Sequence, residues 1–191
     1  MRFADGSVLR LYRQTVEEFG LFSGMEMTQQ QWDKLQEAAG AMSANMRAVR
    51  IVAASSVSQK DLQQRLISKG ESPEHARNAV QWMTDLQLVD DRKTAEQVVA
   101  RCISKGYGLA RAKQALYEKR IPKQYWEEAL MDYPEQTDAI LTFLKDRLGE
   151  NPDERDVKRA IDSLLRRGHS YFRIRRGLEQ LSLETDEFPE E

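Results

Sequence analysis

The sequence predicts an all-α protein in which a tandem repeat of three three-helix units forms an elongated, curved body after a short N-terminal element. Turn-forming residues are scarce, with 10 glycines and 5 prolines in 191 residues, which excludes loop-rich sandwiches and collagen-like chains. From about residue 41 onward, apolar residues recur at helical spacing. Similar helix–turn–helix segments recur around Gly70, Arg120 and Gly168, which lie 50 and 48 residues apart, a period typical of tandem repeats.

The N-terminal extension, residues 1–40, differs from the rest of the chain. Apolar and polar residues alternate over residues 7–13, as in a half-buried β-strand, and the glycine-punctuated stretch 19–25 fits a second extended piece or a turn. Thr28 and Gln31 form a capping-box sequence at the start of a helix. We therefore expect a small β element or a turn, followed by one helix over about 29–39.

Three repeats are expected, over residues 41–89, 90–133 and 134–182. Acid pairs, glycines and prolines mark the helix boundaries within them. The predicted helices cover residues 45–54, 59–69 and 73–86 in the first repeat, 92–104, 109–119 and 122–131 in the second, and 135–148, 153–167 and 171–180 in the third. The acid-rich residues 183–191 are expected to be a disordered tail.

The residue at each repeated turn follows a helix C-terminus, where a left-handed backbone conformation is common. Gly70 and Gly168 adopt this conformation at little cost. Arg120 occupies the same position in the second repeat and is expected to carry about 1 kcal/mol of strain there. Ser72 and Ser170 follow two of these turns and are expected to cap the next helices.

Motifs for catalysis, metal binding or cofactor binding are missing from the sequence. No metal-ligand, phosphate-loop or nucleophile-elbow spacing occurs. The stretch 105–108 contains two glycines, but it joins two predicted helices without a preceding strand, which disfavours a phosphate cradle. The single cysteine, Cys102, lies in an amphipathic pattern and is expected to be a core residue. We expect a protein that is not an enzyme and needs no cofactor or metal.

The sequence shows no signal peptide and no apolar stretch near the ~18 residues that a membrane span needs. We therefore expect a cytoplasmic monomer that does not bind membranes.

The formal net charge of −2 conceals two basic segments. Residues 101–123 contain seven basic residues and one acid, and residues 155–176 contain eight basic residues and two acids. If the basic residues of these two segments lie together on the folded surface, they attract phosphate backbones or acidic protein surfaces. The candidate partner- or DNA-binding residues are Lys105, Arg111, Lys113, Arg159, Arg166, Arg173, Arg175 and Arg176.

Some of this charge has a structural explanation. Lys69, Lys119 and Arg167 precede the repeated turns, where cations stabilise helix C-termini. The cluster 173–176 differs, because its arginines lie in the first turns of a predicted helix, where the helix dipole disfavours cations. This cluster therefore favours a partner contact.

A group of residues forms a recognisable signature: Asp90, Asp91, Gly106, Tyr107 and Gly108, together with the turn glycines Gly70 and Gly168. With these residues the chain resembles the RecX family of bacterial regulators of the recombinase RecA. The resemblance covers about residues 44–181 and is most specific from Leu88 to Ile121. Arg120 and Gln87 stand where the family usually has glycine, and Thr94 stands where it usually has an aromatic residue.

The resemblance implies tandem three-helix units that bind the RecA filament on DNA, in its helical groove. There the protein would block filament growth or promote disassembly, and so lower strand exchange, ATPase and coprotease activity in DNA recombination, DNA repair and the SOS response. It also implies weak direct binding to single- or double-stranded DNA and no cofactor. Two alternatives remain open from the residues: a direct nucleic-acid-binding helical-repeat protein, and an adaptor for another protein partner.

Overall fold

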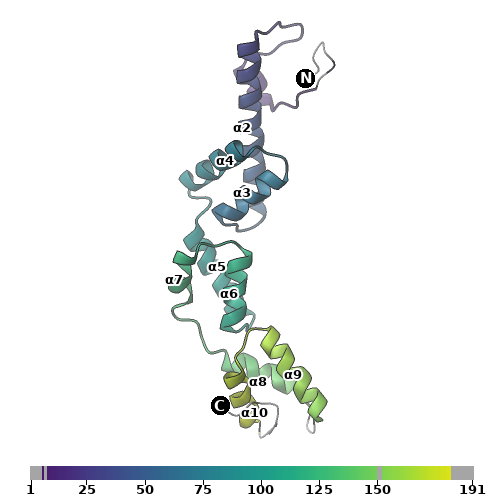
Figure 1. The fold of residues 1–191 in the computed structure, drawn as a ribbon, viewed down its shortest axis with the longest axis vertical. Helices are drawn as coiled ribbons and strands as arrows, with labels where there is room; N and C mark the ends of the chain where they lie inside the picture. The colour runs from purple at the N-terminus through teal and green to yellow at the C-terminus, as the bar shows by residue number, and fades with distance from the viewer. Residues whose placement is uncertain (1–5, 7, 150–151, 182–191) are drawn as a thin grey trace. The chain divides into compact units, whose positions relative to one another are not determined.

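The computed structural model describes residues 6, 8–149 and 152–181, and they form helices joined by short turns (Figure 1). The chain divides into two compact units, Met1–Asp90 and Asp91–Glu191. The all-α prediction is confirmed for the described part of the chain, which contains no β-strand. None of its helices is long and apolar enough to cross a membrane. The predicted acidic tail, residues 183–191, lies outside the described residues.

The first unit contains α1 (Arg13–Glu18), α2 (Gln29–Ala54), α3 (Gln59–Ser68) and α4 (Pro73–Asp85). The β element predicted over residues 7–13 is wrong for the described residues of that stretch. Val8 forms only an isolated bridge, and α1 begins at Arg13. An alternating pattern this short has no stable partner strand, so residues 9–12 form no regular element and the helix begins only at Arg13.

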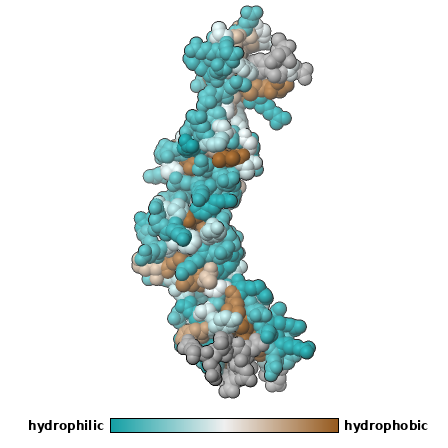
Figure 2. Space-filling model, in the orientation of Figure 1, coloured by the Kyte–Doolittle hydropathy of each residue, from teal (hydrophilic) through white to brown (hydrophobic). Residues whose placement is uncertain are grey.

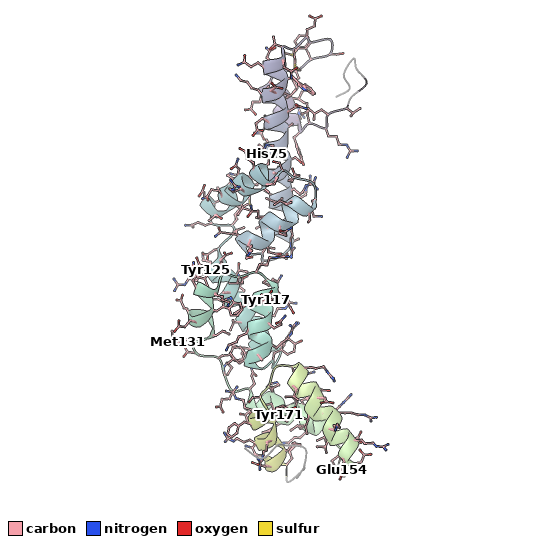
Figure 3. All side chains as sticks on the ribbon, in the orientation of Figure 1. His75, Tyr117, Tyr125, Met131, Glu154 and Tyr171 are labelled. Carbon is pink, nitrogen blue, oxygen red and sulfur yellow. The ribbon has the colours of Figure 1, made fainter. Side chains whose placement is uncertain are left out.

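One continuous helix, α2, replaces the two helices predicted over 29–39 and 45–54. It begins with the predicted capping box, in which Thr28 accepts from the backbone N–H of Gln31 and the Gln31 side chain bonds back. Gly40 does not break the helix. A Cβ atom at Gly40 would lie 2.2 Å from Cε1 of His75, so this glycine makes room for the α4 side chain that crosses it (Figure 3).

The core of the first unit lies among α2, α3 and α4. Leu62, Leu66 and Met83 are fully buried there. A polar network closes one end of this core: the Arg47 guanidinium lies 2.7 Å from the Glu71 carboxylate and donates to the Lys69 carbonyl oxygen at 3.2 Å. Arg47 thereby satisfies a carbonyl at the C-terminus of α3, which helix ends leave without an intrahelical partner.

The second unit contains α5 (Asp91–Ser104), α6 (Leu109–Glu118), the 3₁₀ turn η1 (Lys123–Tyr125), α7 (Trp126–Leu130), α8 (Thr137–Arg147), α9 (Glu154–Arg166) and α10 (Tyr171–Gln180). The helix predicted over 122–131 is therefore only partly α-helical. Pro122 has an extended ψ of 137°, so the chain enters through a 3₁₀ turn. The Trp126 indole N–H then donates to the Ile121 carbonyl at 3.0 Å.

Two cores occupy the second unit. One surrounds Leu116 and Ile121 among α5, α6 and α7. The other surrounds Leu144, Leu164 and Ile174 among α8, α9 and α10. Serine and aspartate side chains cap four of the helices of the chain through their N3 backbone N–H groups, namely Ser58, Ser72, Asp153 and Ser170.

The repeated turn positions have the predicted left-handed backbone. Gly70 and Gly168 have φ values of +91° and +86°, and Arg120 has φ of 54°. Arg120 therefore adopts the strained conformation that the sequence predicts. Gln87 and Gln136 are also left-handed, with φ of 57° and 60°.

Candidate functional site

Two glycine turns interlock inside the second unit. The Gly108 N–H donates to the Arg167 carbonyl at 2.9 Å, and the Ala110 N–H donates to the Gly168 carbonyl at 3.3 Å. A Cβ atom on Gly108 would lie 2.0 Å from the Gly168 oxygen, and one on Gly168 would lie 2.2 Å from the Arg111 nitrogen. We call this contact the glycine joint. It fastens the turn before α6 to the turn after α9 through backbone atoms.

A buried histidine and a half-buried tyrosine form further hydrogen bonds at the glycine joint. His169 is 4% exposed, and its Nε2 lies 3.0 Å from the Gly106 carbonyl oxygen. Because a carbonyl only accepts, Nε2 carries the proton. The Tyr133 hydroxyl donates to the Tyr107 carbonyl at 2.7 Å, and burial raises the pKa of Tyr133 to about 12. The glycines of 105–108 thus serve close packing.

The glycine joint borders a hollow of about 410 Å³, which we call the arginine pocket. α6 and the loop before it contribute one wall, and α8 and α9 with the turn after it contribute the other. Among the described residues that line it, none is acidic. They are Tyr107, Arg111, Phe143, Arg147, Ser163, Arg166 and Arg167.

Three of the four arginines are held in place by neighbours. Arg111 Nη1 lies 2.9 Å from the Glu118 carboxylate, and this hydrogen bond raises the pKa of Arg111 and lowers that of Glu118. Arg166 donates to the Ser163 hydroxyl at 3.2 Å. The Arg167 guanidinium stacks over the Phe143 ring, 4.5 Å from its centroid.

The structure brings two of the eight predicted site residues, Arg111 and Arg166, into the arginine pocket. The other six lie elsewhere on the second unit, whose visible surface is largely hydrophilic (Figure 2). Arg173 is tied to Glu135, donating to its carbonyl oxygen at 3.3 Å. Arg159 and Arg175 lie 3.4 Å and 3.1 Å from Asp156 and Glu179. Lys105 and Arg176 lie over Tyr107 and Phe172, and Lys113 is exposed.

Sequence reasoning does not select five of the seven pocket residues as binding candidates, and one of the five, Tyr107, enters only as a signature residue of the family resemblance. Arg147 and Phe143 lie outside both basic segments, and Ser163 carries no charge to draw notice. Helix capping alone explains Arg167 at the level of the sequence. The spacing of the repeats gives no usable signal, because the glycine joint brings together the turn before α6 and the turn after α9, which are not equivalent positions of the repeats.

Cys102 is 6% exposed, as expected for a core residue. Burial raises the pKa of its thiol above the usual value. The thiol therefore stays protonated near neutral pH and packs as a small apolar group.

The stability of the second unit is expected to fall as the pH drops below about 6.5. Burial, assisted by the charges of Arg167 and Arg173, lowers the pKa of His169 below its ordinary value of 6.5, and Nδ1 has no hydrogen-bond partner among the described groups. The unfolded chain therefore binds more protons than the folded chain below that pH, so unfolding is favoured there.

Urea unfolding at pH 7.5 and 5.5 tests this expectation. The loss of free energy of unfolding between these pH values should be smaller in His169→Gln than in the unsubstituted chain. Parallel pH profiles for the two proteins would contradict a titrating role for His169.

Comparisons with known proteins agree with the geometry. The sequence model of a family described as "RecX, second three-helix domain" matches residues 90–130, which include α5, α6 and the first half of the glycine joint. A protein named "Regulatory protein RecX" from Streptococcus gordonii is 26% identical over 187 residues, 96% of this chain and 72% of that protein. A protein of the same name from Vibrio campbellii is 23% identical over 146 residues, which cover 75% of this chain and 93% of that protein.

Solved structures share the fold. A crystal structure of regulatory protein RecX has a TM-score of 0.63 at 19% identity and covers 90% of this chain and 86% of its own. RecX from Lactobacillus salivarius has a TM-score of 0.63 at 22% identity and covers 76% of this chain and 98% of its own. Signature residues, helix order and relatives agree: over residues 90–130 the chain matches the second three-helix domain of RecX, and it is similar to proteins named "Regulatory protein RecX".

Proposed function

We propose that this chain is a non-enzymatic regulator that binds the RecA–DNA filament in its helical groove and lowers recombinase, ATPase and coprotease activity. The carrying observation is the match, over 187 residues, to a protein named "Regulatory protein RecX". In this proposal, three repeats bind the filament: residues 41–89, 90–133 and 134–182. The protein would act in the cytoplasm, and the processes that it regulates would be DNA repair, DNA recombination and the SOS response.

The distribution of charge supports this proposal. A protein filament assembled on DNA contains the negatively charged phosphates of the DNA, which attract a basic surface. The exposed end of α10 offers such a surface, since Arg175 and Arg176 are exposed beside Phe172, which is 64% exposed. Arg173 is engaged with Glu135, which precedes α8, whereas Arg175 pairs only with Glu179 of its own helix.

Purified protein is expected to lower the DNA-dependent ATPase activity of RecA from the same organism at substoichiometric concentrations. Blocking growth at a filament end requires far fewer molecules than coating the filament. A full titration without effect, on RecA verified as active, would overturn the proposal.

Reversing two charges on α10 tests the contact surface. Arg175→Glu with Arg176→Glu is expected to weaken ATPase inhibition at least 10-fold and to leave helicity unchanged, because both side chains are exposed. Arg173 is kept, so that its contact with Glu135 survives. The matched control is Lys123→Glu with Lys145→Glu, which makes the same charge change on other exposed sites of this unit. Equal effects of both pairs would show that only net charge matters.

A further inference from the structure

The arginine pocket carries positive charge that its described surroundings leave unbalanced. Four guanidiniums line it, and none of its described lining residues is acidic. Arg111 is ion-paired with Glu118, whereas Arg147, Arg166 and Arg167 have no carboxylate partner among the described residues. Planar guanidinium groups bind carboxylates in a bidentate manner. Uncompensated positive charge around a concave surface therefore favours an anionic occupant.

The pocket is formed before an occupant arrives. Ser163 positions Arg166, and the Phe143 ring positions Arg167. Side chains that are already held lose less conformational entropy when they bind. The volume of about 410 Å³ falls within the range of roughly 300–1,000 Å³ that binding pockets show. The pocket can therefore accept more than a single small anion.

The same chain supplies an anionic segment, the acidic tail of residues 183–191. This segment contains no basic residue, and five of its residues are acids: Glu184, Asp186, Glu187, Glu190 and Glu191. It also contains one aromatic residue, Phe188, and an aromatic ring attracts a guanidinium placed over its face. The tail is therefore complementary to the arginine pocket in charge and in side-chain chemistry.

The direction of α10 brings the tail to the α8 wall of the pocket. At the start of α10, Arg173 donates to the carbonyl oxygen of Glu135, which precedes α8. Further along, a Cβ atom at Gly177 would lie 3.2 Å from Cδ1 of Leu144. The two helices thus run in the same direction, and Leu181 packs against the core that α8, α9 and α10 share. The chain leaves α10 beside the last turn of α8.

The tail is long enough to reach the pocket from there. Arg147 follows Leu144 by three residues, which is about 4.5 Å along the axis of α8. Glu184 and Glu191 follow Leu181 by three and ten residues, or about 10 Å and 33 Å of extended chain. A segment attached this closely acts at an effective concentration on the order of 1 mM. A contact with a Kd of about 100 μM between separate molecules would then be about 90% formed within one chain.

We propose that the acidic tail docks in the arginine pocket of its own chain and neutralises its guanidiniums. An anionic partner reaches these arginines only after it displaces the tail. The contact goes beyond the proposed regulation of RecA, because it requires no second molecule, and its tests use neither RecA nor nucleic acid.

Paramagnetic relaxation in the whole 191-residue chain tests the contact directly. A nitroxide is attached at Thr185→Cys, while Cys102 is buried and its thiol stays protonated. At low salt, the backbone amide signals of Arg111 and Ser163 are expected to lose at least 2-fold in intensity. They should recover at 1 M salt, where charges are screened beyond about 3 Å. Unchanged intensities at low salt would overturn the proposal.

Two pairs of substitutions locate the contact. Arg147→Gln with Arg166→Gln is expected to restore the amide signals. The matched control is Arg175→Gln with Arg176→Gln, which removes the same charge from α10, the helix that the tail follows. This control should leave the signal loss within 20% of that in the unsubstituted chain. Recovery in the control instead, or in both variants alike, would place the tail along α10 or in a diffuse cloud of charge, and would overturn the proposal.

Mixing two proteins separates contact within a chain from contact between copies. Spin-labelled chain without ¹⁵N is added to ¹⁵N-labelled chain that lacks the Thr185→Cys substitution. The amide signals of Arg111 and Ser163 should then be unaffected. Signal loss in this mixture would assign the pocket to the tail of a second copy and overturn the contact within one chain.

A neutral tail gives an independent test, because it changes none of the described residues. Five substitutions create it: Glu184→Gln, Asp186→Asn, Glu187→Gln, Glu190→Gln and Glu191→Gln. A fluorescent peptide with the sequence of residues 183–191 should bind this variant about 10-fold more tightly than the unsubstituted chain, whose own tail competes at high effective concentration. Equal affinities, or no binding to the neutral-tail variant at low salt, would overturn the proposal even if the pocket variant melts early.

Discussion

Replacing Gly108 with alanine is expected to lower the free energy of unfolding of the second unit by about 3 kcal/mol. The backbone conformation itself permits alanine, because φ is −75°. The new Cβ would lie 2.0 Å from the Gly168 carbonyl oxygen, and the turn must move away. Overpacking costs about 1–3 kcal/mol, and each of the two interlocking hydrogen bonds contributes about 0.5–1.5 kcal/mol.

Chemical unfolding followed by circular dichroism measures this change. Gly149→Ala is the control in the same unit, since a Cβ there meets nothing within 4 Å, and its stability should change by less than about 0.5 kcal/mol. If both variants unfold alike, the glycine joint does not hold the two helix groups together as closely as its geometry indicates.

Leu116→Ala is expected to cost about 2–5 kcal/mol, through the transfer free energy of the removed apolar atoms and the cavity that remains. Leu116 is fully buried in the core among α5, α6 and α7. The neighbouring Tyr117 is 68% exposed and projects from α6 (Figure 3). Tyr117→Ala therefore serves as a control, with an expected change within about 0.5 kcal/mol.

Thermal melts and urea titrations of the two variants measure these costs. A destabilisation below about 1 kcal/mol for Leu116→Ala, under the range expected for such a truncation, would show that this small core refills the cavity or contributes little to stability.

Local sequence signals predicted most of the helices. Thr28, Ser72 and Ser170 cap helices where their hydroxyl groups are expected to do so, because capping depends on residues only three positions apart. The missed features depend on distant residues. The glycine at position 40 looks like a helix break in the sequence, and only the contact with His75 from α4 explains it.

The candidate site was predictable only in part for the same reason. Arg111 and Arg166 stand out in the charge pattern, whereas Arg147 adjoins an acid in the sequence and Phe143 looks like ordinary core. Their common location depends on the contact between Gly108 and Gly168, 60 residues apart in the sequence. No local pattern encodes that contact.

The glycine joint makes ligand binding and folding thermodynamically dependent on each other. The arginine pocket takes its walls from both sides of the joint, so a ligand that contacts both walls binds only while the joint is closed. Such a ligand at about 100 times its Kd raises the apparent stability of the closed form by about 2.7 kcal/mol. By the same linkage, acid that protonates His169, or alanine at Gly108, would lower the affinity of a site that neither residue touches.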